Sequence, residues 1–342
     1  MINKKIINHI FQIYLFFIMN LRSIKFNPAE KLTLYYILIS TFVAFYINLK
    51  FGTGVSLIGI RLLISAVILF LAYQGSSREK SSINFIRYLF IGSLFVYWYS
   101  ETFYFNRYFE NFDHLLARAD FQMFGFQPSI IFAQVFPQHW FSELMNLGYI
   151  SFFPMLAFTC LYFYVTNRKY AEFFFFTTVL AFFLFYLLFF LIPASGPQYY
   201  FQLIDNKQIS AGIYPSLGDY FSNNYISLRH TPPNGFFSFC LDFIRGDAER
   251  PTGAFPSSHI GNSTLVIILV LAIREYKLAL LLSPLYVLLV LSTVYLGAHY
   301  VTDVIAGFIS AFVFYGLSVY LYPLFSGNNH TDYKIENKKN SK

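Results

Sequence analysis

The sequence predicts an all-α membrane protein: a bundle of about eight spanning helices, with an interfacial N-terminal helix and structured outer loops. Three observations support this prediction. Of the 342 residues 56% are hydrophobic and 12% are charged, whereas soluble domains carry roughly 25% charged residues. Apolar runs long enough to cross the bilayer recur along the chain. Lysines and arginines gather in alternate connectors, as they do on the cytoplasmic side of membrane proteins.

About eight segments come close to the 20 apolar residues that one spanning helix needs. They are residues 32–49, 54–73, 84–105, 142–164, 172–192, 258–274, 278–296 and 300–323. The earlier run 6–20 is interrupted by polar residues, so we interpret it as an interfacial helix, with a first spanning helix as the alternative.

The charge pattern predicts an even number of spans, with both termini in the cytoplasm. The connector 194–256 holds four cations and five anions, which suits an external loop. We therefore expect a multi-pass protein of the cell membrane whose outer loops face away from the cytoplasm. The net charge of +7 follows from the positive-inside rule and indicates no nucleic-acid partner.

We divide the chain into four parts: an interfacial segment 1–30, accessory transmembrane helices 31–105, a catalytic membrane domain 106–325 and a disordered cytoplasmic tail 326–342. Within the third part, residues 113–120 have the pattern of a helix lying along the membrane surface.

His299 and Asp303 are four residues apart at the start of an apolar run, so they share one face of a helix. A carboxylate in that position can orient an imidazole and leave its second nitrogen to act as a nucleophile or base. The alternative is a polar pair that seals a helix end. With His259, the pair also contains acceptable zinc ligands, although no fourth ligand is evident.

Ser257 and Ser258 precede another apolar run and suit the N-cap of its helix, whose first amides can bind phosphate. His259 at the same end can donate a proton to a leaving oxygen, and Arg250 offers a bidentate guanidinium. Each residue also has an ordinary explanation as a cap, an interfacial histidine or a solvated charge. Their occurrence together favours phosphate chemistry at the outer face.

These residues resemble the three-part signature of the type 2 phosphatidic acid phosphatase superfamily. The matching elements are Arg250-Pro251, Pro256-Ser257-Ser258-His259, and Ser292-Thr293 followed by His299 and Asp303. Further stretches are similar to bacterial members of the inositol phosphorylceramide synthase-like branch, an inositolphosphotransferase group. They are Asp113-x-x-Leu116-x-x-x-Asp120 with Phe124-Gly125, the run Glu143 to Phe153, and Ser195-Gly196-Pro197.

The resemblance implies a role for each matched residue. His299 would attack phosphorus and form a phosphohistidine, Asp303 would orient it, and His259 would protonate the leaving group. Arg250 would hold the phosphate together with the region of Ser257 and Ser258. The resemblance implies no metal ion and no cofactor.

Three positions depart from the signature. Phe243 stands where a lysine is usual, and the nearest cation, Arg245, could compensate by binding phosphate. Ser258 replaces a glycine, and Thr293 replaces a phosphate-binding arginine. Because synthase-like members often lack this arginine, the third departure favours that branch.

The sequence thus predicts a metal-independent lipid phosphotransferase or phosphatase, acting through a phosphohistidine on a phosphate-containing membrane lipid at the outer leaflet. The donor lipid, the acceptor and the oligomeric state stay open. One alternative is a phosphatase that only hydrolyses a lipid phosphate or a polyprenyl pyrophosphate. Another is a non-catalytic lipid carrier or scaffold.

Overall fold

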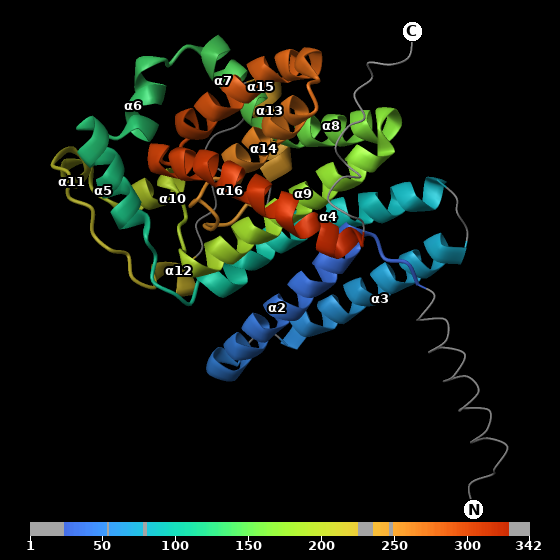
Figure 1. Cartoon of the computed structure of the whole chain (residues 1–342). Helices are drawn as coiled ribbons and strands as arrows, with labels where there is room; N and C mark the ends of the chain where they lie inside the picture. The colour runs from blue at the N-terminus through green and yellow to red at the C-terminus, as the bar shows by residue number, and fades with distance from the viewer. Residues whose placement is uncertain (1–23, 53–54, 78–80, 225–234, 246–248, 328–342) are drawn as a thin grey trace, which may run out of the picture. The chain divides into compact units, whose positions relative to one another are not determined.

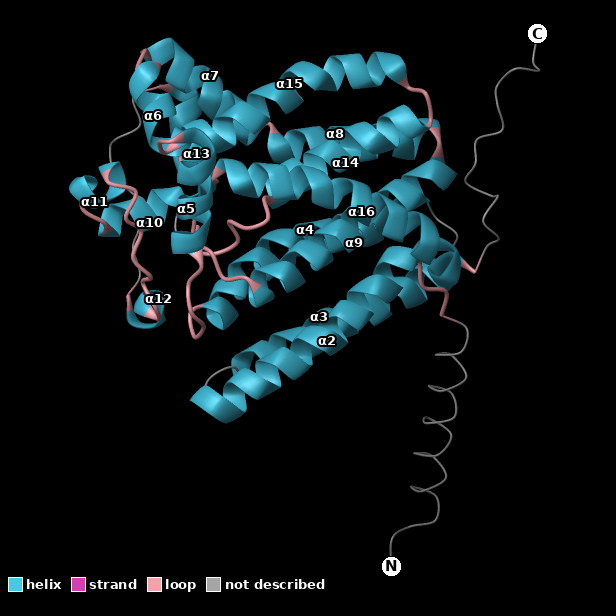
Figure 2. Cartoon of the chain, turned by 60° about the vertical axis from the view of Figure 1, so that its left-hand side comes forward, coloured by secondary structure: helices cyan, strands magenta, loops and turns pink. Residues whose placement is uncertain are grey.

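The computed structural model describes residues 24–52, 55–77, 81–224, 235–245 and 249–327. These residues form helices joined by loops and contain no strand, which confirms the predicted all-α class (Figure 2). The predicted interfacial helix at 6–20 lies outside the described residues, as does the predicted tail from residue 328 on.

The chain forms two compact units, Met1–Leu94 and Phe95–Lys342. The first contains α2 (Pro28–Phe51), α3 (Val55–Ser77) and the first part of α4 (Ser81–Asn106), and α2 and α3 pack side by side (Figure 2). A capping box starts α2, because the Asn27 side chain accepts from Glu30 N at 2.8 Å and the Glu30 carboxylate accepts from Asn27 N at 2.9 Å. The predicted boundary after residue 105 stays a prediction.

The second unit begins in α4 and contains the remaining helices (Figure 1). Its elements are α5 (Asp113–Phe124), α6 (Pro128–Val135), α7 (His139–Ile150), α8 (Phe152–Thr166), α9 (Arg168–Leu191), α10 (Pro197–Tyr200), η1 (Phe201–Leu203), α11 (Asn206–Ser210), α12 (Tyr220–Asn223), α13 (Phe236–Arg245), α14 (Ser258–Ala272), α15 (Tyr276–Tyr295) and α16 (Val301–Ser326). Helix α9 lies at the centre, where it packs against α8, α14 and α16 and buries a row of phenylalanines.

Five described helices are long and apolar enough to span a membrane: Pro28–Phe51, Leu57–Ser76, Arg168–Leu191, Tyr276–Tyr295 and Val301–Ser326. Helices α7 and α8 would make a sixth span if the pair, bent by 43°, crosses as one. The predicted segments 84–105 and 258–274 are also helical, but α14 has only 15 residues. The protein is thus a multi-pass membrane protein, and the number of eight spans stays a prediction.

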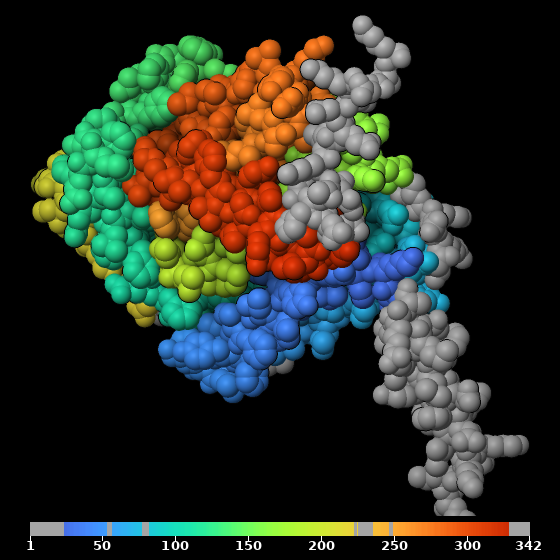
Figure 3. All heavy atoms as spheres, viewed as in Figure 1, coloured from blue at the N-terminus to red at the C-terminus, as the bar shows by residue number. Residues whose placement is uncertain are grey.

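Helix α16 lies at the surface of its unit on the face that Figure 3 shows, where it is drawn in red. Its outward side chains are apolar, with Phe308, Phe312 and Leu324 exposed by 45%, 53% and 70%. A helix with such a face is typical of contact with lipid rather than with water.

Short helices form a layer around the start of α16. Helix α5 packs against α10 and α16, and its residues Leu116 and Ala117 share a buried apolar cluster with Tyr200, Tyr214 and Tyr300. The predicted surface helix at 113–120 is therefore present as α5, and it ends at a left-handed glycine, Gly125.

Helix α13 is held at its start by a carboxylate from α7. Glu143 accepts hydrogen bonds from the amides of Phe237 at 2.7 Å and Ser238 at 2.9 Å. A carboxylate is favourable at a helix N-terminus because it meets unpaired amides and the positive end of the helix dipole. Since Arg245 ends the same helix, this contact also fixes where that guanidinium lies.

Candidate active site

His299 lies in the turn between α15 and α16, and only 2% of its surface is exposed. Its Nδ1 atom is 2.9 Å from the carbonyl oxygen of Ala254 and 3.4 Å from Oδ2 of Asp303. A carbonyl oxygen only accepts, so Nδ1 carries the proton and Nε2 keeps its lone pair. Burial lowers the pKa of His299 to about 4, so the ring is neutral at neutral pH. These are the properties that a nitrogen nucleophile needs.

His259 faces this lone pair from the first turn of α14. Its Nδ1 is 3.4 Å from Nε2 of His299, so the hydrogen bond between the two rings uses a proton on His259. The His259 ring packs against Phe152 and Tyr149, with ring centroids 4.6 and 4.8 Å away. The two histidines, forty positions apart in sequence, are thus in direct contact.

Asp303 is fully buried in the first turn of α16. Its Oδ2 accepts a hydrogen bond from Tyr300 N at 2.9 Å and lies beside Nδ1 of His299. Its main-chain oxygen accepts from Ser257 N at 3.1 Å, which joins the start of α16 to the start of α14. The predicted pair of His299 and Asp303 is therefore present, although the shorter contact of Nδ1 is with Ala254.

Ser257 and Ser258 form the start of α14. The hydroxyl of Ser257 accepts from Ile260 N at 3.3 Å, as an N-cap does, and Ser258 lines the cavity beside His259. The first amides of a helix have no partner inside it, so this terminus offers N–H groups and a positive dipole end to an anion.

Arg245 lies beside the two histidines at the end of α13. Its guanidinium is 4.8 Å from the ring centroid of Tyr149, and its Nε is 3.0 Å from a carboxylate oxygen of Glu249. Among the described residues its buried Nη2 has no hydrogen-bond partner. A buried donor without a partner is costly, and an oxygen of a bound anion would satisfy it.

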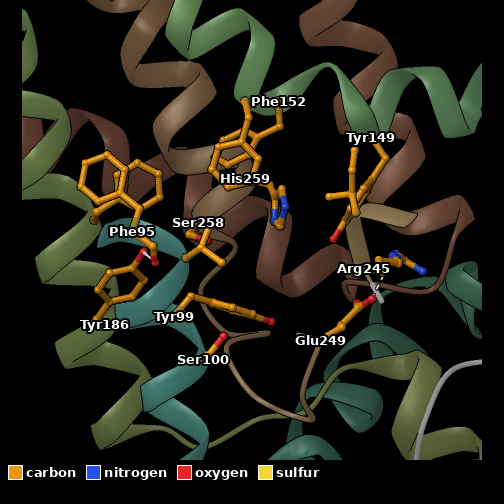
Figure 4. A pocket seen from close by; sticks show the side chains of 14 residues that line it. Phe95, Tyr99, Ser100, Tyr149, Phe152, Tyr186, Arg245, Glu249, Ser258 and His259 are labelled. Carbon is orange, nitrogen blue, oxygen red and sulfur yellow. Dashed lines mark hydrogen bonds and ion pairs between the residues drawn. The ribbon is translucent and has the colours of Figure 1, made fainter. Parts of the chain in front are cut away.

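A cavity of about 140 Å³ is lined by Arg245, Ser258 and His259, whereas His299 and Asp303 do not line it (Figure 4). Figure 4 shows His259, Tyr149, Arg245, Glu249 and Tyr99 around one end, with Phe95 and Tyr186 at the other. The full lining comprises Phe95, Val96, Tyr99, Ser100, Tyr149, Phe152, Phe153, Phe182, Tyr186, Ile244, Arg245, Glu249, Ser258 and His259. The cavity therefore has a charged, polar end and an aromatic end.

A family model described as the PAP2 superfamily matches residues 114–317, more than half of the chain. The chain belongs to the PAP2 superfamily. This superfamily includes membrane lipid phosphatases, in agreement with the apolar helices described above. Comparison with curated proteins and with solved structures gives no significant match. The PAP2 match supports the superfamily, and the predicted synthase-like branch is a finer assignment that it does not reach.

The remaining signature positions of this PAP2 protein do not line the cavity. The loop after Arg250 is fixed through Thr252, whose hydroxyl accepts from Asn106 Nδ2 at 2.8 Å. Arg250 is partly buried but does not line the cavity, whereas Arg245 does. Thr293 is fully buried and donates to Val290 O at 2.8 Å within its own helix. Phe243 is 81% exposed, so it does not replace the usual lysine at the site.

Sequence reasoning missed several groups of the candidate site. They are the Ala254 carbonyl, the aromatic wall of Tyr149 and Phe152 against His259, and the Glu249 partner of Arg245. The available signal was the density of aromatic residues before and after position 150, which by itself indicates only a membrane protein. Among the described residues, no group of three His, Cys, Asp or Glu side chains could hold a metal ion.

Proposed function

We propose that this PAP2 protein transfers the phosphoryl group of a phosphate-containing membrane lipid through a phosphohistidine at His299. The observation that carries the proposal is the orientation of that ring. Its Nδ1 is 2.9 Å from an oxygen that can only accept, while its Nε2 faces His259, which lines the cavity. The nucleophilic nitrogen and the proton donor therefore lie next to each other.

The reaction then has two balanced steps. The Nε2 lone pair of His299 attacks phosphorus, the bond from phosphorus to the lipid oxygen breaks, and His259 gives a proton to that oxygen. Burial and the neighbouring His299 lower the pKa of His259, so the negative charge of the bound phosphate is what keeps this ring protonated for the step. In the second step water or an alcohol attacks phosphorus while His259 takes up its proton, and the bond between phosphorus and nitrogen breaks. Asp303, at 3.4 Å from Nδ1, stabilises the positive charge that develops on the His299 ring.

Positive charge for the phosphate comes from Arg245 and from the start of α14. Phosphoryl transfer requires mainly positioning and neutralisation of charge on the phosphate oxygens. Arg245 has a buried nitrogen without a partner, and Ser257 and Ser258 mark the amides of the helix terminus beside His259. Arg250 stays a further candidate for the phosphate. We propose that these groups suffice without a metal ion, so that activity persists in a chelator.

The aromatic end of the cavity favours a lipid as the substrate. Three apolar residues of the cavity lining, Val96, Phe153 and Ile244, are exposed by 52%, 43% and 52%. In a membrane protein such a rim suits the hydrocarbon of a lipid, while the head group would reach Arg245 and His259. We place the cavity at the outer leaflet, with both termini of the chain in the cytoplasm, because of the positive charges in the alternate connectors.

The phosphohistidine can transfer its phosphoryl group to an alcohol instead of to water. Transfer to an alcohol is favoured by the burial of His299, exposed by 2%, and by the aromatic wall around His259, because a transferase must keep water from the intermediate. The resemblance to inositolphosphotransferases points in the same direction. Hydrolysis alone is the competing outcome.

The test uses the full-length protein in detergent micelles with phosphate-labelled lipids. We expect the wild type to release phosphate or to exchange head groups, and His299→Ala to lose this by a factor of at least about 10³. His139→Ala is the matched control, since His139 is exposed at the start of α7. Adding ceramide, diacylglycerol or polyprenol acceptors separates transfer from hydrolysis. A folded wild type that leaves every lipid unchanged would instead support a carrier.

A further inference from the structure

Helix α5 carries two buried aspartates, Asp113 and Asp120, that the mechanism above does not use. Both are exposed by 0%. They are seven residues apart, and two helical turns bring both carboxylates to the same face of α5. Each accepts hydrogen bonds from two successive main-chain amides and from one hydroxyl. Such a repeated arrangement fixes two separate chain segments to one helix.

Asp120 holds the start of α16. Its Oδ2 accepts from Val301 N at 2.8 Å, and its Oδ1 accepts from Thr302 N at 2.9 Å and from the Thr302 hydroxyl at 2.6 Å. These are the first two amides of α16, the positions at which a helix N-terminus binds an anion. His299 is only two residues before this anchored turn. Asp120 therefore fixes the segment that carries the nucleophile.

Asp113 binds a second segment, residues 195–196, which contacts the turn that carries His299. It accepts from Ser195 N at 2.7 Å and from Gly196 N at 2.8 Å. Gly196 lies so close to the turn that a Cβ there would be 2.7 Å from Ala298 O. The neighbouring Ala194 O accepts from Ala254 N at 3.1 Å, and Ala254 in turn provides the carbonyl that faces His299 Nδ1. Asp113 thus supports the group that fixes the tautomer of His299.

We propose that Asp120 and Asp113 are positioning residues that align Nε2 of His299 with the phosphorus atom, an inference that rests on the proposed role of His299. The two aspartates differ from the catalytic residues because they touch neither the cavity nor either histidine ring. Asp120 also occupies the first two amides of α16.

The decisive variant is Asp120→Asn, which keeps the shape of the side chain but removes one acceptor oxygen. Misplacement of a reacting group by roughly 1 Å can cost about 10²-fold in rate, so we expect kcat and the rate of phosphohistidine formation to fall about 10²-fold. KM for the lipid should stay within about twofold, because no group that binds the substrate changes. Asp113→Asn should act in the same direction.

Asp205→Asn is the matched control, because Asp205 also caps a helix start, with Lys207 N donating at 2.9 Å, but is exposed and lies at α11. Rates are expressed per folded molecule, measured by size exclusion and thermal unfolding. Thr302→Val, which removes only the hydroxyl donor, is the second variant and should slow adduct formation about tenfold.

The outcomes separate the two proposals. A wild type that forms no adduct contradicts the proposed function itself. A wild type that forms it, together with an Asp120→Asn protein of unchanged rate per folded molecule, overturns the positioning role. The positioning role is also overturned if the whole loss of activity in Asp120→Asn reflects fewer folded molecules. If Asp120→Asn does not fold, Thr302→Val decides, and an unchanged rate in that variant overturns the inference.

Discussion

Nε2 of His299 and Nδ1 of His259 face each other at a distance of 3.4 Å. A nucleophile approaches phosphorus to roughly 3–3.5 Å, and a general acid lies roughly 2.6–3.2 Å from the leaving oxygen. A phosphorus atom and a leaving oxygen therefore do not fit between the two nitrogens at this separation. The rings must part when a phosphate enters the space between them.

The role of His259 as proton donor predicts a dependence on the leaving group. For a lipid phosphate the leaving alkoxide needs a proton, so His259→Gln should lower kcat by about 10²–10⁴-fold. For p-nitrophenyl phosphate the leaving phenolate is stable without one, so the rate of the first step, read as the burst of p-nitrophenolate in a single turnover, should stay within about tenfold of the wild type in the same variant. Single-turnover assays of the two substrates measure this difference without the second step, in which His259 acts as a base. An equal loss in the first step with both substrates would show that His259 does not donate the proton.

The position of Arg245 predicts that it contributes more to phosphate binding than Arg250. Arg245 lines the cavity and has a buried nitrogen without a hydrogen-bond partner among the described residues. We expect Arg245→Met to raise KM or lower kcat/KM by about 10–100-fold, since a charge-assisted hydrogen bond contributes about 1.5–3 kcal/mol. Arg250→Gln should have a smaller effect, and Arg118→Gln on the exposed face of α5 should have none. A larger loss of kcat/KM in Arg250→Gln than in Arg245→Met would show that Arg250 contributes more to phosphate binding.

The low pKa of His299 sets the acid side of the pH profile. Burial lowers its pKa to about 4, compared with roughly 6.5 for an unperturbed histidine. A base with a lowered pKa stays unprotonated, so the nucleophile is available above about pH 5, and kcat/KM should fall only below it. Between about pH 6.5 and 4 the unfolded chain binds the extra proton, so stability should also decrease as the pH falls. An acid limb of kcat/KM centred near pH 6.5 would contradict this.

Helices α14 and α16 pack so closely at Gly307 that adding a methyl group there should affect stability and activity. A Cβ on Gly307 would collide with the main-chain oxygen of Ser257, two residues before His259. Gly307→Ala should therefore lower stability by about 1–3 kcal/mol and reduce activity, because α14 carries His259 and α16 carries Asp303. Gly316→Ala, in the same helix but with nothing within 4 Å, should leave both unchanged or raise stability by about 0.5–1 kcal/mol. Thermal unfolding and turnover of both variants give the comparison.

Local features of the site could be predicted from the sequence, because they depend on helical spacing. His299 and Asp303 are four residues apart, and Ser257 caps the helix whose first turn contains His259, so periodicity and capping suffice. The all-α class followed from composition in the same way. The number of spans did not, because α14 has 15 residues and α7 and α8 are bent by 43°, features that apolar runs alone do not distinguish.

Other features depend on contacts between distant segments. The Ala254 carbonyl is 45 residues from His299, with α14 and α15 between them, and only the folded chain brings it to Nδ1. Arg245 was predicted as a substitute for a missing lysine, but its place in the cavity depends on Glu143, which fixes α13 from a helix nearly a hundred residues earlier. Asp120 makes its bonds 181 and 182 residues away. No pattern within a short window contains this information.

The central claim is that Nε2 of His299 forms a bond to phosphorus, and the most direct measurement is to locate that bond. The full-length protein is incubated briefly with a phosphate-labelled lipid, quenched in alkali, digested and analysed by mass spectrometry. The predicted result is an acid-labile phosphate on the peptide that contains His299, absent in His299→Ala and accumulating when the acceptor is withheld. Label on another residue, or product formed at the wild-type rate by His299→Ala, would contradict it.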